Sequence, residues 1–338
     1  MRWVILICLL AVTIIACQRD DDQSDHPALW SKPIAFPEPH YSYDRNDKDV
    51  EVFELGRDLF YDPILSLDST ISCASCHHQS HAFSDTVALS RGVHGRVGVR
   101  NSPPLINLAW NTSFMWDGGV NHIEVFSVAP ITDSAEMALP LARLGERLNS
   151  SPYYSQAFKR AMDSDSITDR QYLLALTQFM GALIADDSPY DRYVKGEHDA
   201  ISTKAQEGLA VFNTFCQSCH QPPLFTDYSF RRNGTYREGG DMGRYLITLQ
   251  EGDIGRFKVP TLRQISLTGP YMHDGRLESL QDVINHYRTA ATEDALIDQA
   301  LKGVDAMTDK EADALLSFLM TLTDDTLQEN PYFSKPLR

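Results

Sequence analysis

The motif Cys-x-x-Cys-His occurs twice in this chain, from Cys73 to His77 and again from Cys216 to His220. In this pattern the two thiols form thioether bonds to the vinyl groups of a haem, and the adjacent histidine supplies a ligand to the iron. Two attached haems indicate a redox protein. The motifs lie far enough apart in the sequence for each haem to occupy its own domain.

A four-cysteine zinc site is the alternative explanation, since two Cys-x-x-Cys pairs can hold Zn²⁺. Zinc pairs are usually separated by roughly 12–20 residues, and they do not require a histidine after each second cysteine. The wide separation and the two histidines therefore favour haem.

The overall composition predicts a soluble globular protein of two domains. The chain has 338 residues, of which 43% are hydrophobic and 22% charged, and these values are typical of soluble proteins. Its formal net charge of −16 argues against nucleic acid and anionic membrane surfaces as partners. The charge would steer a basic partner such as a small electron-carrier protein, although it would equally serve to keep the protein soluble.

Residues 1–17 have the features of an export signal. Arg2 precedes an apolar run that is too short to span a bilayer well. The run ends in Ile14 to Cys17, which resembles the bacterial lipobox and implies lipidation of Cys17. Gln18 follows instead of aspartate, which is typical of outer-membrane lipoproteins. An ordinary signal cleaved near Ala16 is the alternative, and both alternatives place the protein in the periplasm.

The remaining chain is predicted to be mainly α-helical, with two cytochrome-c-like haem domains related by internal duplication. A polar, Pro-rich tether is expected over residues 18–45. An N-terminal haem domain follows over 46–195 and a C-terminal one over 200–325, with the charged segment 186–202 as their boundary. Buried helices are expected over 172–180 and 314–319. Cys8 lies in the signal, so no cysteine is left for a disulfide.

Matching motifs in the two halves support the duplication. A Gly-x-x-(Leu/Val)-Phe pattern precedes each haem motif, and Phe-(Ser/Thr)-Asp follows each. The same spacing separates Leu105 from Asp117 in the first half and Leu262 from Asp274 in the second.

Over roughly residues 50 to 322 the chain resembles the bacterial di-haem cytochrome c peroxidases and their relatives of the MauG type. The resemblance rests on motifs in the family's order: Leu55 to Pro63, Arg100 to Pro103, Trp116 to Gly118, Glu136-Met137 and Pro270 to Gly275. It implies an oxidoreductase with a peroxidatic N-terminal haem and a C-terminal haem that receives electrons.

Glu136 matches the family's distal glutamate, which implies that it takes a proton from H₂O₂ and returns it to the leaving oxygen. A glutamate that merely favours a helix N-terminus is the alternative. The family's distal glutamine falls at Phe126, so this hydrogen-bonding group is lost.

His94 lies where the cytochrome c peroxidases carry a displaceable sixth ligand, and its neighbouring glycines suit a mobile loop. His78 and His81, which follow His77 closely, are rival ligands, and an exposed surface histidine is the remaining alternative.

Tyr287 occupies the position where many peroxidases have a methionine ligand to the second haem, and tyrosine there resembles the MauG-type branch. The alternative is that His286 is the ligand and Tyr287 belongs to the core. Neighbouring helix residues point about 100° apart, so only one of them can face the iron.

Trp116 matches a tryptophan between the two haems and would couple them, unless it is simply a core residue. Asn101, Thr268 and Pro270 match positions that hold an inter-domain Ca²⁺, to which one side-chain and two backbone oxygens would be suitable ligands. Loop structure alone is the alternative.

The sequence thus predicts a di-haem peroxidase that reduces H₂O₂ to water with electrons from a small donor such as a c-type cytochrome. A MauG-like oxidase that uses peroxide to oxidise Trp or Tyr of a protein substrate is the first alternative. A non-catalytic electron-transfer module is the second. The resemblance also implies a homodimer as one assembly. The lipobox implies that a lipid anchor is the sole membrane contact.

Overall fold

Helices account for nearly all regular structure in the computed structural model, which describes residues 32–41, 50–294 and 296–337. This confirms the predicted fold class. The first half carries α1 (Val50–Tyr61), α2 (Val128–Thr132), α3 (Leu141–Asn149), α4 (Pro152–Met162) and α5 (Asp169–Gly181). After α6 (Pro189–Val194), the second half carries α7 (Thr203–Phe215), β1 (Phe230–Arg231), α8 (Tyr245–Thr248), β2 (Phe257–Lys258), α9 (Leu280–Glu293), α10 (Asp309–Leu319) and α11 (Thr326–Glu329).

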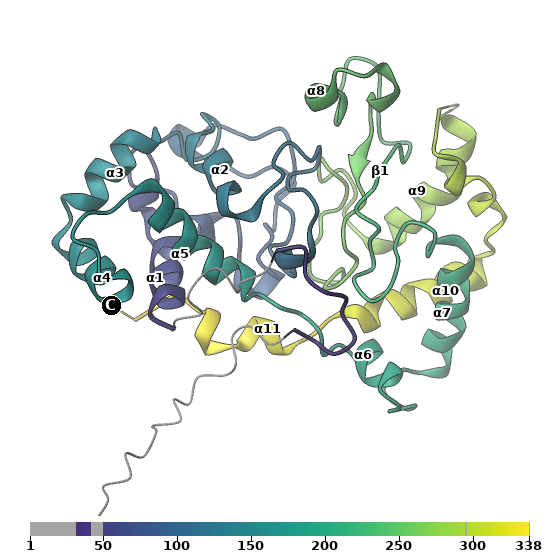
Figure 1. Cartoon of the computed structure of the whole chain (residues 1–338). Helices are drawn as coiled ribbons and strands as arrows, with labels where there is room; N and C mark the ends of the chain where they lie inside the picture. Colours follow the sequence, from purple (N-terminus) through teal and green to yellow (C-terminus); the bar gives the residue numbers. More distant parts are fainter. Residues whose placement is uncertain (1–31, 42–49, 295, 338) are drawn as a thin grey trace, which may run out of the picture.

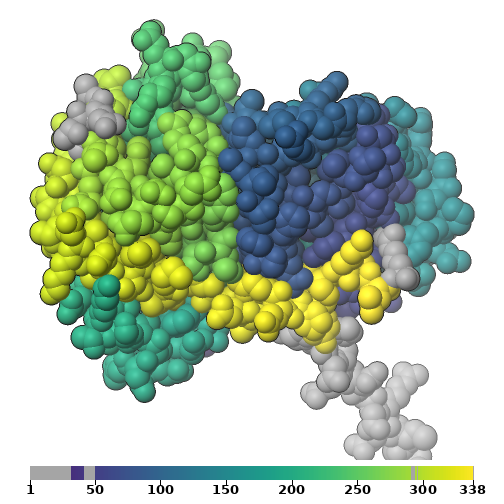
Figure 2. All heavy atoms as spheres, turned by 180° about the vertical axis from the view of Figure 1, so that it is seen from behind, coloured from purple at the N-terminus to yellow at the C-terminus, as the bar shows by residue number. Residues whose placement is uncertain are grey.

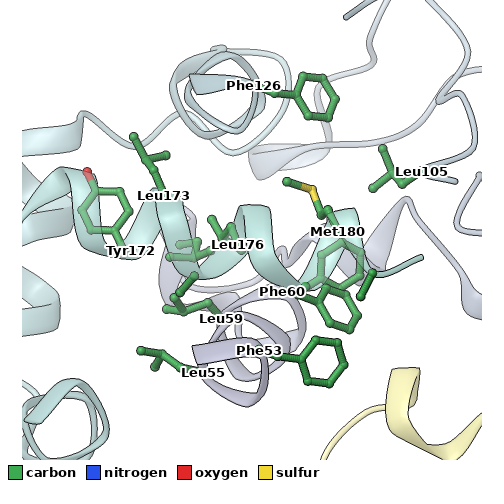
Figure 3. Close-up of a cluster of buried hydrophobic side chains, with 14 of the residues drawn as sticks. Phe53, Leu55, Leu59, Phe60, Leu105, Phe126, Tyr172, Leu173, Leu176 and Met180 are labelled. Carbon is green, nitrogen blue, oxygen red and sulfur yellow. The ribbon is translucent and has the colours of Figure 1, made fainter. Parts of the chain in front are cut away.

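Each half is built on one pair of packed helices. The apolar face of α1 packs against α5 in the first half, and α7 packs against α10 in the second (Figure 1). In the first half, Phe53, Leu59 and Phe60 from α1 meet Leu176 and Met180 from α5 (Figure 3). The helices predicted over 172–180 and 314–319 are therefore present, as the central parts of α5 and α10.

Glycine makes the close approach of each helix pair possible. A Cβ atom on Gly56 would lie 1.9 Å from the backbone oxygen of Ala175, and one on Gly208 would lie 2.0 Å from that of Ala314. The two glycines belong to the motif that the sequence repeats ahead of each haem. The repeated glycine therefore reflects the packing of a helix against its neighbour's backbone.

Replacing Gly208 with alanine is expected to destabilise the protein, because the added methyl group must push α7 away from α10. Overpacking of this kind costs about 1–3 kcal/mol, which urea unfolding of the haem-loaded protein would measure. Gly252→Ala is the matched control, since a Cβ there meets no atom within 4 Å. Equal stability of the two variants would contradict this account of the helix pair.

The duplication extends to the loops that follow the helices. Met115 and Met272 both adopt positive φ, at 68° and 74°, and each is followed by a glycine with positive φ at the same spacing. Backbone bridges close the two turns equivalently, from Phe114 to Val120 and from Tyr271 to Leu277. The short antiparallel pair of β1 and β2 is found in the second half, below a projecting segment that carries α8 (Figure 1).

The C-terminal segment returns to the first half, which the sequence analysis did not anticipate. The backbone oxygens of Leu327 and Asn330 accept hydrogen bonds from Gln79, at 3.1 and 2.8 Å. Phe333 joins the core of the first half, where its ring lies 6.2 Å from that of Phe53. In Figure 2 this segment, in yellow, crosses both halves.

Part of the predicted tether packs on the protein body. Phe36 is buried against the edge of the Trp110 ring, with centroids 5.1 Å apart, and the Trp110 indole donates to the Pro37 oxygen at 2.9 Å. The signal peptide, including Cys8 and the lipobox Cys17, lies outside the described residues. Among the helices that the structure describes, none is both long and apolar enough to cross a membrane.

Candidate di-haem site

The two motif histidines are held in the same way. The Nδ1 atom of His77 lies 2.6 Å from the backbone oxygen of Phe83, and that of His220 lies 3.1 Å from the oxygen of Phe225. Both phenylalanines have positive φ, which turns their carbonyl groups toward the rings. A histidine that donates from Nδ1 to a carbonyl group presents Nε2 to a metal. Both residues are therefore oriented as proximal haem ligands.

Burial keeps both imidazoles neutral, which is the form that binds iron. Burial is the main cause that lowers the pKa of His77 to about 4, although the Phe83 carbonyl and Asp85 act in the opposite direction. The pKa of His220 is also lowered by burial, against the Phe225 and Pro260 carbonyls. None of the four motif cysteines is paired in a disulfide, so all four can form thioether bonds.

The second half contains a large, mainly apolar cavity at its haem motif. Cys216, Cys219 and His220 line one part of it, and Tyr287 and apolar side chains such as Leu315 line others. Two thiols and a histidine at an apolar cavity fit a covalently attached haem, because the porphyrin needs an apolar enclosure and one axial nitrogen. The residues present therefore fit the group that the motif implies.

Tyr287 and His286 have different surroundings. Tyr287 lines the cavity, and burial raises its pKa to about 12, with Asn233 acting to lower it. The Nε2 atom of His286 instead lies 2.8 Å from the backbone oxygen of Asn233. His286 is thus engaged by the backbone, and this arrangement favours Tyr287 as the residue that faces the second iron.

Trp116 lies where the two halves meet. Its indole nitrogen donates to the backbone oxygen of Asn101 at 2.8 Å. Trp116 lines both the large cavity and a second, smaller cavity, whose other walls include Leu105, Phe114 and Phe126 of the first half. Trp116, which the sequence predicts to couple the haems, therefore lies at the junction of the first and second halves.

Glu136 lies close to the first haem motif. Burial is the main cause that raises the pKa of Cys73 to about 12 and that of Cys76 to about 11, and the charge of Glu136 adds to both. Glu136 is an exposed residue, but desolvation of its carboxyl group and, to a smaller extent, the charge of Asp133 raise its pKa to about 7. A carboxyl group that titrates near neutrality can both accept and return a proton.

The His94 loop is attached to the Glu136 segment. The backbone amide of Val93 donates to the backbone oxygen of Glu136 at 2.8 Å. The His94 side chain itself is 58% exposed, and its Nδ1 atom lies 3.6 Å from Asp68. The structure therefore brings the loop to the distal glutamate, while the His94 ring faces Asp68 at the surface.

The rival histidines have partners of their own. The Nε2 atom of His78 lies 3.7 Å from Asp85, and the Nδ1 atom of His81 lies 3.0 Å from the Ser80 hydroxyl. Phe126 (Figure 3), which is predicted to stand at the position of the family's glutamine, is 8% exposed. Its ring packs against that of Phe114, with centroids 5.1 Å apart. Its surroundings are apolar, as expected for a residue that provides no hydrogen bond.

The three predicted calcium ligands lie at one cavity. Asn101, Thr268 and Pro270 all line the large cavity. The Asn101 amide nitrogen donates to the Val87 and Ala88 oxygens at 3.2 Å each, which turns its amide oxygen the other way. The described part of the chain contains no group of three or more His, Cys, Asp and Glu suited to a metal ion, so a cation here would depend on carbonyl and amide oxygens.

Sequence reasoning missed two polar features at the junction of the halves. Arg100 pairs with Asp117 of its own half at 2.5 Å and joins the halves by an ion pair with Asp241 at 2.6 Å. Lys258 reaches from β2 to the Ser113 oxygen at 2.6 Å. The signal for Lys258 was a single lysine among Phe257, Val259 and Pro260.

A duplicated helical scaffold with one haem-attachment motif in each half defines a di-haem c-type cytochrome. The family model for di-haem cytochrome c peroxidase matches residues 50–199. MauG, a methylamine utilization protein of Methylorubrum extorquens, is 34% identical over a 335-position alignment that covers 95% of this chain and 93% of the relative. The chain therefore belongs to the di-haem cytochrome c peroxidase and MauG family, and it is an enzyme with two covalently bound c-type haems.

Other relatives include peroxidases. Cytochrome c551 peroxidase of Nitrosomonas europaea is 31% identical over 294 residues, which cover 84% of this chain and 88% of the relative. The crystal structure of a MauG-like protein associated with microbial copper homeostasis has a TM-score of 0.85 at 30% identity, over 91% of this chain and 99% of that chain. The diheme peroxidase BthA of Burkholderia thailandensis, at 22% identity and a TM-score of 0.70 over 86% and 91%, shares the fold.

Proposed function

We propose that this protein reduces H₂O₂ to water with electrons from a small donor protein such as a c-type cytochrome. Each turnover joins one H₂O₂ with two electrons and two protons to give two water molecules. The observation that carries the proposal is the position of Glu136, whose carboxyl group lies near Cys73 and Cys76 and has a pKa of about 7.

Each residue has a defined part in this reaction. His77 would hold the N-terminal haem, which when bound supplies the iron that takes up peroxide. The Glu136 carboxylate would take a proton from the attacking side of H₂O₂ and return it to the leaving oxygen. His220 and Tyr287 would hold the C-terminal haem, and Trp116 would connect the two halves.

A MauG-like oxidase is the second candidate, because three observations favour it. Tyr287 lines the large cavity, the His94 ring faces Asp68 at the surface, and MauG aligns along 95% of the chain. In that case, peroxide would be used to withdraw electrons from Trp or Tyr residues of a protein substrate.

Rapid mixing of the fully oxidised protein with one equivalent of H₂O₂ separates these functions. A peroxidase blocked by His94 at rest gives no absorbance change until one haem is reduced, and His94→Ala then makes the oxidised protein reactive. A prompt change in the wild type would instead support the MauG-like oxidase.

Replacing Tyr287 with phenylalanine is expected to change the absorption spectrum of one haem and to raise its reduction potential, because a tyrosinate ligand stabilises ferric iron. We expect a rise of at least about 59 mV, which is tenfold in a one-electron equilibrium. His286→Gln is the control and should leave the spectrum unchanged. The reverse pattern would assign the ligand to His286.

The finer features of location and assembly remain predictions. We propose a periplasmic protein anchored to the outer membrane through a lipid on Cys17. A homodimer and a Ca²⁺ ion held by Asn101, Thr268 and Pro270 belong to the same proposal. The common position of these three residues at the large cavity supports the calcium site.

A further inference from the structure

Lys258 connects the two halves at the point where the large and the smaller cavity meet. It is the second residue of β2, and its backbone amide donates to the Trp116 oxygen at 2.7 Å. Its side chain extends into the first half, where Nζ donates to the backbone oxygen of Ser113 at 2.6 Å and lies 6.0 Å from the centroid of the Phe114 ring. Among the residues that the structure describes, Lys258 is the one charged side chain that lines both cavities.

The side chain of Lys258 is partly buried, and its ammonium group lacks the partners that a charge removed from water requires. It has three donors, and within the described ranges the Ser113 backbone oxygen is the one hydrogen-bond acceptor recorded for it. No carboxylate of the described residues lies within ion-pair distance of Nζ, and Asp117 acts on it only at longer range. The neighbouring Ser113 hydroxyl is also buried without a hydrogen-bond partner.

The Lys258 side chain is nevertheless charged at neutral pH. Burial lowers its pKa to about 8, with Asp117 acting in the opposite direction, so most molecules carry the proton at pH 7. A buried charge without a counter-ion is costly, and buried charges in proteins are therefore normally paired. The junction of the halves thus presents a positive group and a free hydroxyl that suit a carboxylate.

The available protein carboxylates at the large cavity are already used. Asp298 lines that cavity but pairs with Arg231 at 3.2 Å. Each c-type haem brings two propionate carboxylates of its own, and the haem motif of the second half lines the same cavity as Lys258. A haem propionate is therefore the anion whose chemistry best fits this position.

We propose that Lys258 is a positioning residue that pairs with a haem propionate where the two halves meet and raises the reduction potential of that haem. The oxidised haem carries one more positive charge than the reduced haem, so a nearby cation favours reduction. The proposal rests on the two covalent haems and is independent of peroxidase activity.

Spectroelectrochemical titration of the haem-loaded protein without peroxide tests this pairing. Lys258→Met is expected to lower one of the two reduction potentials by about 59 mV, a tenfold change in a one-electron equilibrium. Lys258→Arg keeps the charge, so the equilibrium constant for reduction of that haem should stay within threefold of the wild-type value. Lys302→Met removes an equal charge from an exposed position and should change neither potential.

Two results would overturn the proposal: unchanged potentials in Lys258→Met with both haems attached, or an equal shift in Lys302→Met. Lys258→Gln provides the same comparison if the methionine variant attaches less haem. Because the titration contains no peroxide, a protein that fails as a peroxidase still gives a clear result.

Discussion

Replacing Glu136 with glutamine is expected to lower peroxide turnover by roughly 10²–10⁴-fold, the usual contribution of a positioned general acid–base. Glutamine has nearly the same shape but cannot take up or release the proton. Both haems should remain attached, which their absorption spectrum and the protein mass would verify. Glu146→Gln is the matched control, because Glu146 is an exposed residue on α3.

The pH dependence gives this prediction a second, independent test. With a pKa of about 7, Glu136 is half ionised at that pH, and the fraction that carries the negative charge and can act as a base grows as the pH rises. Turnover at low peroxide concentration should therefore rise as the pH increases through about 7. Asp133→Asn removes a charge that raises the pKa of Glu136, so the midpoint should move to lower pH. A profile that Glu136→Gln leaves intact would exclude Glu136 as the titrating base.

Replacing both Cys73 and Cys76 with serine is expected to abolish donor-driven peroxide turnover and to leave a protein whose mass corresponds to one attached haem. The matched variant at Cys216 and Cys219 also carries one haem, and it should lose turnover with the protein donor as well. After chemical reduction, however, the matched variant should still show a peroxide-induced absorbance change, because the N-terminal site is intact.

The comparison of the two cysteine variants assigns the peroxidatic half. Donor-driven turnover that survives in the Cys73 and Cys76 variant would place peroxide chemistry in the second half. Far-UV circular dichroism serves as the control for folding, since each half packs its helices into an apolar core that contacts the first cysteine of its haem motif.

The sequence was sufficient for the features that depend on local patterns. Apolar periodicity located α5 and α10, and the repeated glycine motif revealed the duplication. Each of these signals is a pattern within a short stretch of sequence. The sequence did not reveal why glycine is needed at these positions, since Gly56 approaches the backbone of Ala175, which lies far away in the chain.

Features that depend on long-range contacts could not be predicted. Lys258 meets Ser113 across 145 positions, and Gln79 meets Asn330 across 251. The choice between His286 and Tyr287 required the position of the α9 helix relative to Asn233, which the 100° spacing of helix residues leaves open. The exposed orientation of His94 likewise depends on Asp68 and not on the glycines beside it.

The most direct test of the central claim is the stoichiometry of the reaction with a reduced small c-type cytochrome as donor. The account predicts that two donor molecules are oxidised for each H₂O₂ consumed, and that Glu136→Gln nearly stops both processes together. Peroxide loss without donor oxidation, or donor oxidation that continues without peroxide, would contradict it.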